Sequence, residues 1–253
     1  MYHRLRYFLR NVCYFLTVCN LRHMSVSHRR ALLANCGKLP NLCGAHRVLD
    51  GLLWRGKAHL PVAAAQRRRS TKKKQPPAAG IQLGKDVDAL LGEHAGDAWR
   101  RPLNGAKGLA LDMARSGLAM LRKNGFVATD QQLRVPSAEL ECAPVLDLFG
   151  YIKEEGHTRR IPAVVEIKCG RSARSRTLVG QAATFRGKRF KHWRDTRRNR
   201  CMAQLALQTI CVQRVLGTDD VRGMLLCIPT KGRASLTVVE ELMCETMLAE
   251  LNC

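Results

Sequence analysis

Three charged residues lie inside two otherwise apolar segments of the chain. Asp147 stands in PVLDLFG, and Glu166 and Lys168 stand in AVVEIKCG. Both segments are rich in β-branched and aromatic residues, which is typical of strands. Residues two apart on a strand share a face, so Glu166 and Lys168 emerge together and their apolar neighbours point to the other side. Because a charge is costly inside an apolar strand, this placement indicates a functional role.

Asp147 and Glu166 are predicted to face each other across a hairpin. The polar turn KEEGHTRR joins their strands, and both residues are equidistant from its centre at Gly156 and His157. Their Cβ atoms would then be about 5 Å apart, where two carboxylates repel unless a cation or a shared proton lies between them. Removing either carboxylate should therefore stabilise the metal-free protein. The E-x-K spacing alone also fits an ordinary surface hairpin.

A divalent cation would resolve this repulsion. Carboxylate oxygens at this spacing suit Mg²⁺ or Mn²⁺, which keep several waters and accept substrate phosphate as a further ligand. Such an ion activates water, and Lys168 beside it would orient that water or neutralise charge developing on phosphorus. The residues thus predict metal-assisted hydrolysis of a phosphate ester.

The charge balance predicts a polyanionic partner. Lys and Arg number 43 against 20 Asp and Glu, which gives a formal net charge of +23 and a pI near 10.3. Nucleic acid is the first partner that such a charge indicates; an anionic membrane surface and a ribosome-like scaffold are the alternatives.

The stretch from Arg171 to Arg200 concentrates this charge, with Phe185, Phe190 and Trp193 interleaved. We expect its basic residues to hold backbone phosphates with little sequence specificity, and its aromatic rings to stack on unpaired bases. The alternative is a basic insertion whose aromatic residues anchor it to the core. The candidate nucleic-acid-binding residues are Arg171, Arg174, Arg176, Arg186, Lys188, Arg189, Lys191 and Trp193.

The chain divides into a basic extension and a globular part. Residues 1–79 are predicted to be largely unstructured, because they contain an Arg-rich start and the linker-like run RRRSTKKKQPPAA. The start resembles an organellar transit peptide and the run a nuclear import signal, so nucleus and mitochondrion both stay open. Eleven scattered cysteines without a C-x-x-C pair favour an intracellular reducing compartment. The apolar stretch 7–21 is too short to span a membrane.

The globular part, residues 80–253, shows periodic segments of both kinds, which indicates an α/β class. Helices are expected at 86–93 and at 104–123, the second with Asn104 as N-cap and Asn124-Gly125 as its stop. A third is expected at 199–216, ended by Gly217, and a fourth at 241–251. The expected strands are 132–139, 144–152, 161–169, 221–228 and 235–240.

With these residues in place, the chain resembles the PD-(D/E)XK nucleases, in their RecB-like and phage λ exonuclease-like branch. The resemblance rests on Asp147, Glu166 and Lys168, and on Gln204 in NRCMAQLALQ, and it covers residues 80–253. It implies a restriction-endonuclease-like αβββαβ core, with a central mixed sheet flanked by helices. It also implies Mg²⁺-dependent cleavage of phosphodiester bonds in DNA or, less often, RNA.

The resemblance also implies roles for individual residues. Asp147 and Glu166 correspond to the metal ligands, which the backbone carbonyl of Ile167 completes, and Lys168 to the residue that positions or deprotonates the attacking water. Gln204 corresponds to the helix glutamine of the branch, but Gln208 stands where an aromatic residue is usual. Branch members carry a His or Glu from the first helix into the site; the candidates here are Asp88, Glu93 and His94.

The expected function is therefore a nuclease acting in DNA repair, recombination or replication processing. The branch favours an exonuclease over an endonuclease, with Mg²⁺ as cofactor and Mn²⁺ as a substitute. No motor motif is present, so a partner helicase or recombination protein, or a free DNA end, is expected. The alternative is a catalytically inactive nucleic-acid-binding protein that retains the fold. The presence of all three residues Asp147, Glu166 and Lys168 favours the nuclease over this alternative.

Overall fold

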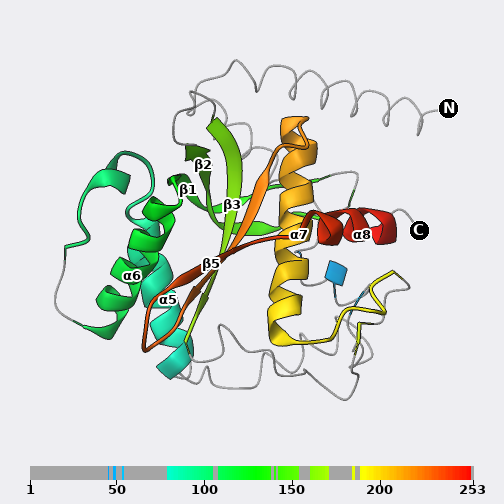
Figure 1. Ribbon diagram of the computed structural model, residues 1–253. Coiled ribbons are helices and arrows are strands. Elements are labelled where there is room, and N and C mark those ends of the chain that lie inside the picture. Colours follow the sequence, from blue (N-terminus) through cyan, green and yellow to red (C-terminus); the bar gives the residue numbers. More distant parts are fainter. Residues whose placement is uncertain are drawn as a thin grey trace, which may run out of the picture.

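The computed structural model describes residues 79–104, 108–137, 140, 142–153, 160–170, 184–185 and 189–251, together with four residues near position 50. Its helices and strands follow one another in the order predicted for an αβββαβ core (Figure 1). They are α5 (Ala79–Gly92), the 3₁₀ helix η1 (Gly96–Arg100), α6 (Leu109–Lys123), β1 (Phe126–Arg134), β2 (Val145–Lys153), β3 (Arg160–Cys169), α7 (Arg197–Leu216), β4 (Arg222–Ile228), β5 (Ser235–Val238) and α8 (Glu241–Leu251).

The five strands form one mixed sheet in sequence order, from β1 to β5. Neighbouring strands are antiparallel except β3 and β4, which are parallel. Parallel neighbours need a long crossover, and α7 lies within it. The predicted α/β class and mixed sheet are therefore confirmed.

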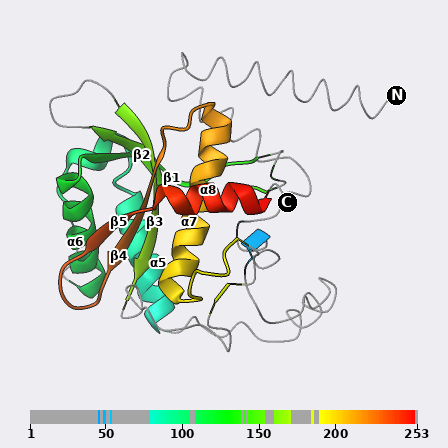
Figure 2. The same cartoon turned by 45° about the vertical axis from the view of Figure 1, so that its right-hand side comes forward.

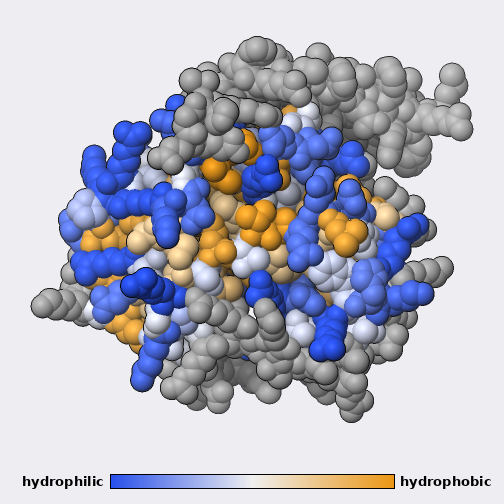
Figure 3. All heavy atoms as spheres, in the orientation of Figure 1, coloured by the Kyte–Doolittle hydropathy of each residue, from blue (hydrophilic) through white to orange (hydrophobic). Residues whose placement is uncertain are grey.

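Helices cover both faces of the sheet. Figures 1 and 2 show α5 and α6 on one face and α7 and α8 on the other. Each face has its own apolar cluster: Leu91, Leu118 and Val165 belong to the first, and Leu205 and Leu225 to the second. On the surface seen in Figure 3, apolar side chains show in the middle and hydrophilic ones surround them. The sheet is thus buried on both sides, as expected where a helix connects parallel strands.

Helix α7 ends at Leu216, as predicted, and begins at Arg197, two residues before the predicted 199. Thr196 caps α7 by accepting a hydrogen bond from the Asn199 backbone N–H at 3.1 Å, and Gly217 ends the helix with φ of 61°. A left-handed residue after the last turn is a common helix stop, and glycine adopts it at the least cost. The predicted bounds of α8 are confirmed.

Three predicted boundaries are wrong. The helix expected at 86–93 begins seven residues earlier, at Ala79. The helix expected from Asn104 begins at Leu109, after Gly108, which provides no side-chain cap. The strand expected at 132–139 lies at Phe126–Arg134, directly after the Asn124-Gly125 turn. Lys153 donates its backbone N–H to the carbonyl of Gly125 at 2.9 Å, so pairing with β2 decides where β1 begins.

The hairpin of β2 and β3 has the predicted register. Leu148 pairs with Val165 and Ile152 with Ile161, so partners are equidistant from Gly156 and His157, which lie outside the described residues. Ladder pairing ends at Leu148 and Val165, one step before Asp147 and Glu166 would meet.

Most of the predicted extension, residues 1–79, lies outside the described residues. Ala45, Leu49 and Leu53 are described and are buried in the cluster beneath α7. The division near residue 79 therefore stays a prediction, with a few residues before it packed on the core. In the portion of the chain that is described, no helix has the length and apolarity needed to cross a membrane.

Candidate active site

Strand β3 carries the predicted Glu166 and Lys168 on the face that packs against α7. Ala163, Val165 and Ile167 belong to the cluster beneath α5 and α6, whereas Val164 belongs to the cluster beneath α7. Strand alternation therefore places Glu166 and Lys168 with Val164. The two residues form an ion pair, with Glu166 only 2% exposed and Lys168 half-buried.

Both oxygens of Glu166 are held by side-chain donors. Oε1 accepts hydrogen bonds from Lys168 and from Nε2 of Gln204, the latter at 2.8 Å. Oε2 accepts one from Nε2 of Gln208, also at 2.8 Å. Since a carboxylate oxygen accepts about two hydrogen bonds, Oε1 is saturated and Oε2 keeps one lone pair. A buried carboxylate is thus compensated and fixed in orientation.

Gln208 also contacts Glu166, although it stands where the family pattern has an aromatic residue. Besides Glu166, its Nε2 donates to the backbone carbonyl of Val145 at 3.0 Å, which ties α7 to the start of β2. Its Oε1 is buried and has no partner among the described residues. The available signal was the spacing of four from Gln204, which puts both amides on one helix face.

Asp147 lies where the β-ladder is interrupted. Its Oδ2 accepts the backbone N–H of Ile167 at 2.7 Å, so a side chain replaces a strand acceptor. On the other side, Gln132 adopts φ of 47° and its amide lies 3.4 Å from Oδ1 of Asp147. Burial, and then the negative charge of Glu166, raise the pKa of Asp147 to about 7, against the opposing charge of Lys168.

The same electrostatic environment acts on Lys168. Burial alone would lower the pKa of this amine, but the negative charges of Glu166 and Asp147 outweigh it and hold the pKa above its ordinary range. Lys168 is therefore a cation in the metal-free protein.

Among the three first-helix candidates, only Asp88 lies toward these residues. Burial raises its pKa to about 6, with Lys168 lowering it and Glu166 raising it. Its Oδ1 is buried and has no hydrogen-bond partner among the described residues. The imidazole of His94 lies 3.2 Å from the carbonyl of Pro102 instead, and Glu93 is exposed after the end of α5.

The donor atoms that meet here fit a hard divalent cation. They are the carboxylate oxygens of Asp147 and Glu166, and Asp88 supplies a further buried oxygen without a partner among the described residues. Among the residues that the structure describes, no three His, Cys, Asp or Glu side chains stand close enough to form a complete metal cage.

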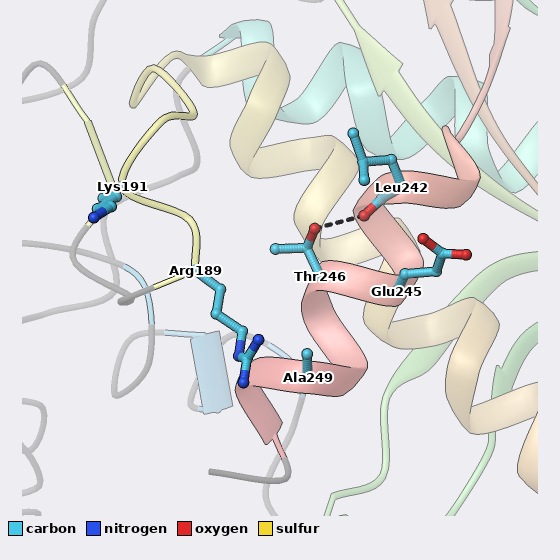
Figure 4. A pocket seen from close by; sticks show the side chains of 6 residues that line it. All are labelled: Arg189, Lys191, Leu242, Glu245, Thr246 and Ala249. Carbon is cyan, nitrogen blue, oxygen red and sulfur yellow. Dashed lines mark hydrogen bonds between the residues drawn. The ribbon is translucent and has the colours of Figure 1, made fainter.

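The predicted nucleic-acid-binding residues are only partly described. Arg189 and Lys191 line a pocket against α8 with Glu245 and Thr246 (Figure 4). The backbone N–H of Arg189 donates to a carboxylate oxygen of Glu250 at 2.9 Å. The other predicted basic residues lie outside the described part: Arg171, Arg174, Arg176, Arg186 and Lys188.

The prediction that all three aromatic residues of this stretch stack on bases is wrong for Phe185 and Phe190. Both side chains are fully buried in the cluster beneath α7, with ring centroids 5.8 Å apart. Trp193 is partly buried and packs against the same cluster. The alternative reading, in which aromatic residues anchor the basic segment, therefore describes the two phenylalanines.

Comparisons with known proteins add little to this geometry. No protein-family model matches the sequence, and no curated protein matches it. A crystal structure of a proposed exonuclease from Eubacterium rectale is similar, with a TM-score of 0.46 and 11% identity, over 90% of this chain and 82% of that one. Neither the fold nor the activity of this chain rests on that similarity.

Proposed function

We propose that this chain is a Mg²⁺-dependent nuclease of the PD-(D/E)XK type that hydrolyses phosphodiester bonds in DNA. The observation that carries the proposal is that Asp147 of β2 lies beside Glu166 and Lys168 of β3, on one αβββαβ scaffold, at a break in the β-ladder. Placing two acidic side chains and a lysine inside a sheet costs stability, which indicates that these residues serve a function.

The proposed cation ligands are Asp147, Glu166 and the backbone carbonyl of Ile167, with Asp88 nearby as a further acid. When bound, Mg²⁺ would polarise the phosphate and make a coordinated water more acidic. Lys168 would orient the attacking water or offset charge developing on the phosphate oxygens. Because three donors already occupy Glu166, we propose that it binds the cation through Oε2 alone.

The second candidate is a nucleic-acid-binding protein without catalysis. A net charge of +23 supports binding in either case, so charge does not separate the two. Metal-dependent cleavage does, because only the nuclease needs the carboxylates.

The test uses the purified full chain with end-labelled linear DNA and closed circular DNA, each single- and double-stranded, with Mg²⁺ or with chelator. We expect cleavage of linear DNA only with the metal, proceeding from ends. Asp147→Asn should be inactive, whereas Asp112→Asn, which removes a 73% exposed acid on α6, should retain activity.

Each result separates two readings. Cleavage of circles would replace the exonuclease preference with an endonuclease. Binding without cleavage of any DNA or RNA would favour the second candidate. Full activity of Asp147→Asn would overturn the proposed site.

A further inference from the structure

One side of α7 contacts the carboxylate of Glu166 and extends along the helix past that contact. Arg197, Cys201, Gln204 and Gln208 are spaced by four, three and four residues, so they form one stripe on a helix of about 3.6 residues per turn. Two of the four, Gln204 and Gln208, donate to Glu166. The stripe is therefore the side of α7 that packs on the site.

The stripe runs along β3 from Glu166 toward Lys168. Gln208 and Gln204 contact Glu166, and one turn earlier the thiol of Cys201 lies in the field of Lys168. Burial raises the pKa of Cys201 to about 11, while Lys168 and, more weakly, Arg197 lower it. Arg197 thus lies on the same side, one turn beyond Cys201.

Neighbouring arginines of the same turn are engaged elsewhere. Arg200 makes a bidentate pair with the buried Asp195, at 2.6 and 2.7 Å. A guanidinium nitrogen of Arg198 lies 3.4 Å from the hydroxyl of Thr237 on β5. Arg197 is exposed, and no hydrogen bond or ion pair of its side chain is found among the described residues.

We propose that Arg197 binds a backbone phosphate of the nucleic acid at the entrance of the site, beyond Lys168. An arginine is always charged, and its planar fork matches two phosphate oxygens. Held on the stripe that fixes Glu166, this group positions the strand relative to the carboxylates. The inference rests on the proposed function, and it assigns a phosphate contact to Arg197, which is not among the eight candidate residues named for the stretch 171–200.

The test measures binding of a short fluorescent oligonucleotide to the full chain in chelator, over a series of salt concentrations. Arg197→Ala should weaken binding roughly tenfold and reduce the salt slope by about 0.7–0.9. Arg198→Ala, the matched control on the same turn, should change both much less. Arg197→Lys should keep most of the salt slope but not the full affinity, because the charge remains and the fork is lost.

A second arm locates the phosphate. In a series of oligonucleotides, a single uncharged methylphosphonate linkage is moved one position at a time. For one of them, the parent and Arg197→Ala should bind with the same affinity. If Arg197→Ala and Arg198→Ala behave alike, or no linkage abolishes the difference, the proposal is overturned. Binding through Arg197 without Mg²⁺-dependent cleavage would overturn the nuclease instead, so the two failures are distinguishable.

Discussion

The two faces of the sheet are built from different chemistry. An apolar cluster lies beneath α5 and α6, and β3 contributes Ala163, Val165 and Ile167 to it. Beneath α7, the same strand contributes Glu166, which is buried together with Gln204 and Gln208. The first face therefore stabilises the fold through apolar packing. The second face holds a buried, oriented carboxylate, which lowers stability.

The largest expected effect is on catalysis at the polar face. Asp147→Asn, Glu166→Gln and Lys168→Ala should each lower the DNA cleavage rate by about a hundredfold to a thousandfold or more, because each removes a ligand or a charge-stabilising group. Rates measured at saturating substrate, beside Asp112→Asn, test this. A variant that keeps the parent rate does not carry the assigned role.

The largest effect on stability should come from the apolar face. Leu226 is fully buried on β4 against α6, so Leu226→Ala should reduce the free energy of unfolding by about 2–5 kcal/mol. Ile81→Ala, at a 58% exposed position of α5, should change it little. Urea unfolding of both variants makes the comparison, and equal losses would mean that burial of Leu226 in this cluster is not what stabilises the fold.

Asp147 should behave differently from Glu166 in metal-free protein. Its pKa is raised from 3.8 to about 7, so the folded state binds a proton more tightly and the parent loses stability as the pH rises from about 4 to 7. Asp147→Asn should therefore be more stable than the parent in chelator at pH 8, by up to about 4 kcal/mol, and no more stable at pH 4.

Glu166 changes the simple expectation that either carboxylate variant gains stability. Because Lys168 compensates it, Glu166→Gln should lose stability in chelator. Thermal melts with chelator and with Mn²⁺ test both variants. Mn²⁺ should raise the midpoint of the parent only; an equal rise for Asp147→Asn would mean that Asp147 is not a ligand.

A smaller effect is expected from the amide that orients Glu166. Gln208→Leu keeps the volume but removes the donor to Oε2, so Mn²⁺ affinity and cleavage should fall about 10- to 100-fold. The control is Gln213→Leu, near the end of α7, because the Gln213 side-chain amide donates to the backbone carbonyl of Asp219 and not to Glu166. Calorimetric titration with Mn²⁺ separates this role from packing, since a purely structural residue would change the melt and not the affinity.

Deletion of residues 1–43 should have the smallest effect on the melting temperature. All proposed site residues lie from Asp88 onward, and the buried Leu49 and Leu53 are retained. Deletion of 1–79 removes those two side chains and should lower the melting temperature. Equal melting temperatures for the two deletions would show that the core cluster does not need them.

The sequence by itself determined the features that depend on local periodicity and local stops. The alternation of β3 placed Glu166 and Lys168 on one face, and the register predicted from the sequence, symmetric about positions 156 and 157, is the one that brings Asp147 close. Gly217 marked the end of α7. Each follows from the chain's own geometry over a few residues.

Only the tertiary structure decided which distant side chains meet. In the folded chain, Asp88 lies toward the carboxylates, whereas Glu93 and His94 do not. Gln208 donates to Glu166, and Phe185 and Phe190 are buried in the core. Strand β1 also begins earlier than predicted, because pairing with β2 outweighs local strand preference. These outcomes depend on how α5 and α7 pack against opposite faces of one sheet, and no local pattern encodes which turn of a helix reaches a given strand residue.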